Sequence, residues 1–256
     1  MPAGGKRAGV FASFAKFPSF VDRTLAAVNT EGADSETNLS SVPTLTFSLT
    51  QMADALLQSL RECASREGTD QQYASDVMLI ENTYFFGESI RMRNPALATL
   101  FAPHLNVCDG LFKKSAHAYV KFMMKREFKG LFVLFQTIAR IRKDVGDGDV
   151  PIHCPRATFI RTLSKEAGGD VLNERIREIR KRMEKHVSEE SGVLSKLWSE
   201  VGVVFLADYL GFEKVAALLY NHKFDVGREE LQRILRIAGG ETIGRRRSGT
   251  AQQGNS

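Results

Sequence analysis

Cysteine, proline and tryptophan are scarce in this sequence, with three, seven and one among 256 residues. The cysteines (Cys63, Cys108 and Cys154) are odd in number and widely separated, which excludes a disulfide framework and a zinc signature and favours a reducing compartment. No apolar run approaches the roughly 18 to 20 residues that a membrane-spanning helix needs. The N-terminal segment also lacks the continuous apolar region of a signal peptide.

Strong charge of one sign is absent as well. Lys and Arg number 35 against 30 Asp and Glu, so the formal net charge is only +5, too small by itself to indicate a nucleic-acid-binding protein. What the chain does have is apolar content, at 43% hydrophobic and 9% aromatic residues. That composition supplies the core of one large domain or two small ones.

The apolar residues recur at helical spacing along most of the chain, and no segment alternates as a strand would. We expect helices near 49–66, 70–93, 105–126, 128–142, 155–167, 170–190, 191–210, 212–221 and 226–238. Pro18 interrupts the apolar pattern of 10–28 and predicts two short helical pieces or one broken helix. Residues 29–47 are polar and predict a loop. Ser48 with Gln51, and Thr69 with Gln72, have the spacing of helix-capping boxes.

The residues therefore predict an all-α fold of antiparallel helices with short connections. Gly and Asp cluster in 144–151 and indicate a linker. We expect short helices and a polar loop over 1–47, a first helical bundle over 48–143, a C-terminal helical bundle over 152–240, and a disordered basic tail over 241–256 that contains Arg245–Arg247.

Patterns typical of catalysis are missing. None of the five histidines has metal-ligand spacing to another His or Cys, and the adjacent His153 and Cys154 do not share one helical face. There is no phosphate-binding glycine loop and no nucleophile elbow. We predict no catalytic, cofactor-binding or metal site and no enzymatic activity. Trp198 and the aromatic clusters are interpreted as core residues, and Glu178 with Arg182 as a favourable helical ion pair.

One helix has an unusual charge pattern. Lys114, His117, Lys121 and Lys125 fall on one side of the segment 111–126, opposite an apolar side, and no acidic residue interrupts them. This side is either a contact for acidic lipid or an acidic partner, or a solvated outer face of a bundle helix. Weaker candidates for the same role are Arg177, Lys181 and Lys185, which are interleaved with glutamates.

Four stretches occur in the order in which they are found in a known family. They are GVFASFAKFPSFVDR (9–23), DVMLIENTYFF (76–86), HAYVKFMMKREFKGLFVLFQTIARI (117–141) and RIREIRKRMEKHVSEESGVLSKLW (175–198). They resemble the C-terminal region of the exocyst complex component 1 family, the Sec-three subunit of the exocyst. The resemblance spans roughly residues 8 to 238. It implies an elongated, rod-like stack of antiparallel helical bundles of the type found in tethering complexes.

The resemblance also implies a non-enzymatic scaffold that helps the exocyst tether secretory vesicles to the plasma membrane. Expected partners are other exocyst subunits, and an acidic phospholipid surface and small GTPases stay open as further partners. No small-molecule substrate is expected and nucleic acid is disfavoured. The expected location is cytoplasmic and peripheral at the plasma membrane or at sites of secretory vesicles. The alternative is a basic helical module that binds acidic membranes or nucleic acid independently of the exocyst.

Family members are usually longer and carry an N-terminal phosphoinositide-binding domain. Because no such domain precedes the matching region here, we expect a truncated or divergent form, or a fragment. The segment from Val10 to Val28 is expected to pack poorly by itself and to dock on the rest of the chain or on a partner.

Overall fold

The computed structural model describes residues 9–31, 41–66, 72–93, 95–188 and 192–240. Within these ranges the chain is built from helices without a strand, as the sequence predicts. The helices are α1 (Ala12–Glu31), α2 (Ser41–Arg66), α3 (Gln72–Arg91), α4 (Pro95–Leu100), α5 (Ala102–Glu127), α6 (Lys129–Val145), α7 (Val150–His153), α8 (Arg156–Ala167), α9 (Gly169–His186), α10 (Val193–Tyr220) and α11 (Arg228–Ala238). The predicted basic tail, 241–256, lies outside the described residues.

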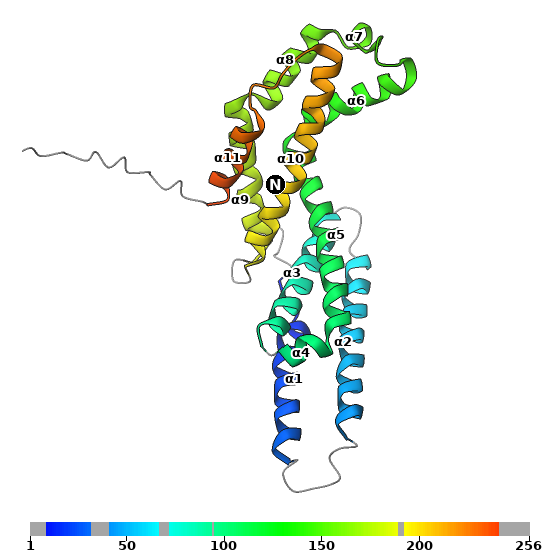
Figure 1. The fold of residues 1–256 in the computed structure, drawn as a ribbon, viewed down its shortest axis with the longest axis vertical. Helices are drawn as coiled ribbons and strands as arrows, with labels where there is room; N and C mark the ends of the chain where they lie inside the picture. Colours follow the sequence, from blue (N-terminus) through cyan, green and yellow to red (C-terminus); the bar gives the residue numbers. More distant parts are fainter. Residues whose placement is uncertain (1–8, 32–40, 67–71, 94, 189–191, 241–256) are drawn as a thin grey trace, which may run out of the picture.

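The molecule is elongated, with its helices arranged in two parts along the long axis (Figure 1). α1, α2 and α4 lie at one end, and α6 to α11 lie toward the other. α5 runs from the first part into the second, with α3 packed along it. The chain descends through α1 and returns through α2, so these two helices are antiparallel.

Two apolar clusters form the core. The first contains Phe14, Leu57, Phe86 and Phe101 and joins α1, α2, α3 and α4 to the start of α5. The second unites the rest of α3 and α5 with α6 to α11. The clusters adjoin along α3 and α5, where Val77 and Met78, neighbours in sequence, belong to different clusters. Both clusters therefore contain residues of α3 and α5. The division of the chain into bundles at the linker 144–151 stays a prediction.

Two helices at the N-terminal end differ from the predictions. α1 continues through Pro18 as one helix, although proline cannot donate to the carbonyl of Phe14. Burial of Phe14, Phe17 and Val21 on the rest of the first cluster outweighs that loss. α2 begins at Ser41, within the predicted loop.

Ser48 lies inside α2 instead of capping it. Its hydroxyl donates to the carbonyl of Thr44 at 2.9 Å, one turn earlier. The capping-box prediction there was wrong, because the apolar register that starts near Leu45 and Leu49 continues into the helix. Thr69 lies outside the described residues.

α10 is the longest helix and runs through Gly211, where the sequence predicted a break between two helices. Its aromatic side chains satisfy carbonyl groups at the ends of other elements. Trp198 Nε1 donates to the carbonyl of Leu235 at 3.0 Å, and the hydroxyl of Tyr209 donates to that of Val226 at 2.9 Å. These buried bonds confirm that Trp198 is a core residue and fix α11 and its preceding loop against α10.

Candidate functional site

The structure divides the predicted basic surface of α5. Lys114, His117 and Lys125 are exposed. Lys121 is only partly exposed and its Nζ lies 3.3 Å from Oδ1 of Asp208 on α10. Because a carboxylate from another helix faces the middle of the row, the four side chains do not form the uncompensated stripe that the sequence suggested.

A second carboxylate lies near the start of the same row. Asp76 of α3 is hydrogen-bonded to Ser115 and is close enough to Lys114 for the ammonium group to act on its titration. Burial nevertheless raises the pKa of Asp76 to about 6, against the opposing effects of Ser115 and Lys114. This part of α5 therefore carries less positive charge than its own sequence indicates.

The weaker candidates on α9 likewise do not form one uncompensated basic surface. Arg177 and Lys185 are exposed, whereas Lys181 Nζ pairs with Glu178 Oε1 at 2.6 Å. The pKa of Glu178 is lowered first by its hydrogen bond to Lys181 and also by the charge of Arg182, so the predicted attraction between Glu178 and Arg182 is present. The direct ion pair of Arg182 is with another helix: its Nε lies 2.7 Å from Oε1 of the largely buried Glu127, which joins α9 to the end of α5.

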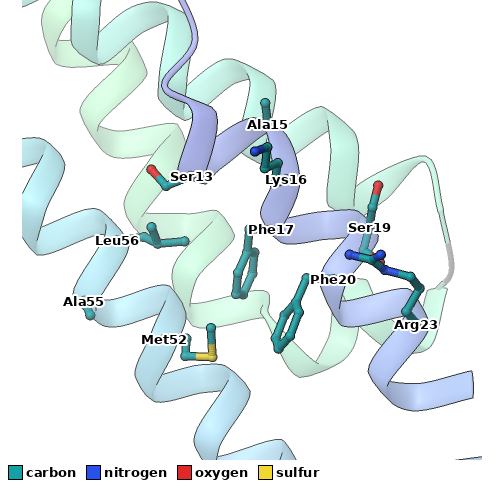
Figure 2. A pocket seen from close by; sticks show the side chains of 10 residues that line it. All are labelled: Ser13, Ala15, Lys16, Phe17, Ser19, Phe20, Arg23, Met52, Ala55 and Leu56. Atoms are coloured by element: carbon teal, nitrogen blue, oxygen red, sulfur yellow. The ribbon is translucent and has the colours of Figure 1, made fainter. Parts of the chain in front are cut away.

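A different feature stands out as an interaction site: an open apolar groove of about 680 Å³ between α1 and α2. Figure 2 shows Phe17 and Phe20 of α1 on one side of the groove, and Met52 and Leu56 of α2 across from them. The remaining lining residues are small or polar and include Ser13, Ala15, Ser19 and Ala55, with Lys16 and Arg23 as the charged members. We call this feature the α1–α2 groove.

The groove arises because α1 and α2 each use their main apolar stripe against α3 and the rest of the first cluster. Phe14 and Phe17 contact Phe86, with ring centroids 6.0 and 5.8 Å apart. A second apolar row on each helix is left over, and its members stay exposed: Phe20 by 38% and Met52 by 43%. Large exposed side chains that face each other across a groove are typical of a surface that another element covers.

The cationic residues of the α1–α2 groove keep their charge available. Among the residues that line it, Lys16 and Arg23 are basic and none is acidic. The acidic neighbour on α1, Asp22, is already paired with Arg93 at 2.6 Å. Arg93 also donates to Ser19 Oγ at 3.2 Å, which holds this ion pair against α1.

A buried asparagine fixes where α1 begins. The Asn82 side chain on α3 accepts from the amide of Phe11 at 2.8 Å and donates to the carbonyl of Gly9 at 3.3 Å. It also donates to the carbonyl of Met78 at 2.9 Å, within its own helix. The N-terminal segment thus docks on the rest of the chain, as one of the two expected outcomes, and one wall of the groove is set in place by α3.

The α1–α2 groove is absent from the predictions made from the sequence. The available signal was the excess of apolar residues beyond the main stripe: Phe20 next to Phe17, and Met52 with Leu56 beside the stripe of Leu49, Ala53 and Leu57. That signal predicts a second contact face for each helix, but does not say that the two faces meet.

In the described part of the chain, the His, Cys, Asp and Glu side chains form no group of three or more placed to hold a metal ion. None of its helices is both long and apolar enough to cross a membrane.

The fold and the groove define the class: an elongated, all-α protein that presents a cationic-edged apolar groove between two helices. The sequence model described as Exocyst complex component Sec3, C-terminal, matches residues 3–222. The chain belongs to this family, as the resemblance in its motifs implied.

The chain is also similar to Exocyst complex component 1 of Dictyostelium discoideum, with 22% identity over 233 residues. The match covers 90% of this chain and 25% of that protein, so the chain spans about a quarter of the length of the relative. No solved structure matches the chain.

Proposed function

We propose that this chain acts as a non-enzymatic helical scaffold within the exocyst, where it helps to tether secretory vesicles to the plasma membrane. The observation that carries the proposal is the family match over residues 3–222. The proposed location is cytoplasmic and peripheral at the plasma membrane or secretory vesicles, and the proposed partners are other exocyst subunits.

The geometry supports a role in contact. Buried polar side chains hold the helices in place, as Asn82 does for the start of α1. Glu81 Oε1 likewise accepts from the amide of Ser188 at 2.6 Å and ties α3 to the end of α9. Such bonds stiffen an elongated stack, and its exposed faces then provide area for partners.

The experiment is depletion of the chain in cells followed by measurement of secreted cargo. Slower delivery, with vesicles accumulating close to the plasma membrane, is expected, together with recovery when the full chain is returned. Normal secretion and vesicle distribution after complete depletion would contradict the proposal. A returned Val203→Glu variant, changed at a side chain that is 67% exposed on α10, serves as the surface control and should restore secretion.

The acidic-lipid contact through Lys114, His117, Lys121 and Lys125 is a separate proposal, weakened by the carboxylates of Asp208 and Asp76. Reversal of the exposed charges in a Lys114→Glu/Lys125→Glu double variant tests it. A membrane contact predicts loss of binding to anionic vesicles, with steep salt dependence. Unchanged vesicle binding would remove it.

A further inference from the structure

We infer that the α1–α2 groove receives an amphipathic helix of another exocyst subunit, with acidic residues flanking the apolar face of that helix. The inference rests on the proposed function for the source of the helix. It goes beyond that function by naming the site on this chain and the chemistry of its occupant.

The shape of the groove favours a helix. Its lining runs from Ser13 to Arg23 on α1, which corresponds to roughly 15 Å or about three helical turns. Its two walls are helices, and a third helix packs against such walls by fitting its side-chain ridges between theirs. An apolar row with the spacing i, i+3, i+4 and i+7 would contact Phe20 on one wall and Met52 with Leu56 on the other.

The positive charge of the groove favours acidic residues on both sides of the apolar row of the bound helix. Lys16 and Arg23 line the groove without an acidic residue among the lining, and Lys16 takes part in no ion pair among the described residues. Glutamate or aspartate beside the apolar row of the occupant would supply the missing counter-charges. Complementary charges at the edge of an interface steer association and disfavour wrong partners.

The same charges disfavour a second copy of this chain as the occupant. In a two-fold dimer the same patch lies on both sides, so Lys16 and Arg23 of each copy would be brought toward those of the other. Like charges at the edge would then oppose burial of Phe20 and Met52.

The test uses the full chain and two synthetic peptides of about 18 residues, long enough for roughly five helical turns. Both are fluorescein-labelled and carry leucines at i, i+3, i+4 and i+7; one has glutamates on both flanks, and its match has lysines there. Fluorescence anisotropy should show that the glutamate peptide binds at least roughly tenfold more tightly than the lysine peptide. Equal binding of both peptides, or of neither, would overturn the inference.

Variants locate the binding. Phe20→Glu on α1 and Met52→Glu on α2 each change an already exposed side chain, so the fold should persist by circular dichroism, while binding of the glutamate peptide falls roughly tenfold or more. Val203→Glu, at an exposed position on α10, is the matched control and should bind as the unmodified chain does. A Lys16→Glu/Arg23→Glu variant should prefer the lysine peptide. Binding that survives both groove variants would place the peptide elsewhere and overturn the inference.

Other occupants give different results. Self-association in sedimentation that Phe20→Glu abolishes would assign the groove to a second copy. Binding of anionic vesicles that Phe20→Glu abolishes, without peptide binding, would assign it to lipid. Either result overturns the inference. If the native chain fails to bind the glutamate peptide but still recovers exocyst subunits, only the inference is removed. If the native chain binds the peptide but recovers no exocyst subunit, the proposed function is removed.

Discussion

Tyr119 on α5 and His186 in the last turn of α9 form a hydrogen bond of 2.8 Å between the phenol oxygen and Nδ1. Burial lowers the pKa of His186, and the nearby charges of Arg126, Arg182 and Lys185 lower it further. The lowered pKa favours the neutral imidazole at this hydrogen bond. Tyr73 of α3 stacks on the same ring with centroids 4.8 Å apart, so three helices meet at one histidine.

The lowered pKa of His186 makes stability depend on pH. Below pH about 6.5 the unfolded chain binds a proton at His186 before the folded chain does. The contribution of His186 to the free energy of unfolding should therefore fall as the pH drops from about 6.5 toward the lowered pKa. Urea denaturation at a series of pH values should show this fall in the difference in free energy of unfolding between the native chain and His186→Gln, because the pH dependence of other groups is common to both. His153→Gln, at an exposed position, should retain the full fall; an identical pH profile in His186→Gln would contradict the assignment.

Asp76 provides the opposite dependence. Its pKa is raised from 3.8 to about 6, first by burial, so ionisation costs folding free energy as the pH rises through that interval. Asp76→Asn keeps an acceptor for Ser115 and should stabilise the chain at pH 7 by on the order of 1 kcal/mol, since solvent screens part of the shift. The gain should vanish near pH 4 in denaturation curves. A loss of stability at pH 7 would show that the charge of Asp76 is favourable.

Gly239 is required by its contact with Trp198. A Cβ added at Gly239 would lie 2.5 Å from Trp198 Nε1 and 2.7 Å from Cδ1. Gly239→Ala should therefore push α11 away from α10 and weaken the bond from Trp198 to Leu235, at a cost of roughly 1–3 kcal/mol. Gly211→Ala is the control, because an added Cβ has open space in the middle of α10 and should stabilise by about 0.5–1 kcal/mol. Thermal denaturation measures both; a neutral Gly239→Ala would refute the close contact.

Two phenylalanines on α1 distinguish a side chain that stabilises the fold from one that is available to a partner. Phe17 is 4% exposed and packs on Phe86 and Phe101, so Phe17→Ala should cost about 3–5 kcal/mol. Phe20 lies three residues further along α1, at the open side of the groove, and Phe20→Ala should cost about 1 kcal/mol or less. Chemical denaturation of the two variants compares them directly. Equal losses would mean that Phe20 is part of the core and unavailable to a partner.

The periodicity of the sequence was enough to predict most helices, and the particular failures have particular causes. α8 and α11 were predicted within a few residues because proline or glycine marks their ends: Pro155 and Gly168 flank α8, and Gly227 and Gly239 flank α11. Pro18 and Gly211 were given too much weight, since burial of neighbouring side chains holds both helices together. The basic row on α5 looked uncompensated because Asp208 and Asp76 come from other helices.

The α1–α2 groove could not be predicted from the sequence for a related reason. Local periodicity identifies the face that each helix buries, but the meeting of two leftover rows depends on how α1 and α2 both pack on α3. Phe20 and Met52 are 32 positions apart, and no local pattern relates them.

If this chain works as part of the exocyst by holding a partner in its α1–α2 groove, purification through a different exocyst subunit should recover it with the complex. Size-exclusion chromatography, followed by quantification of this chain in the complex, measures the recovery. The native chain and Val203→Glu should elute with the complex in equal amounts, and Phe20→Glu, although folded, should be reduced. Elution of the native chain only at its own mass, away from every exocyst subunit, would rule out this role.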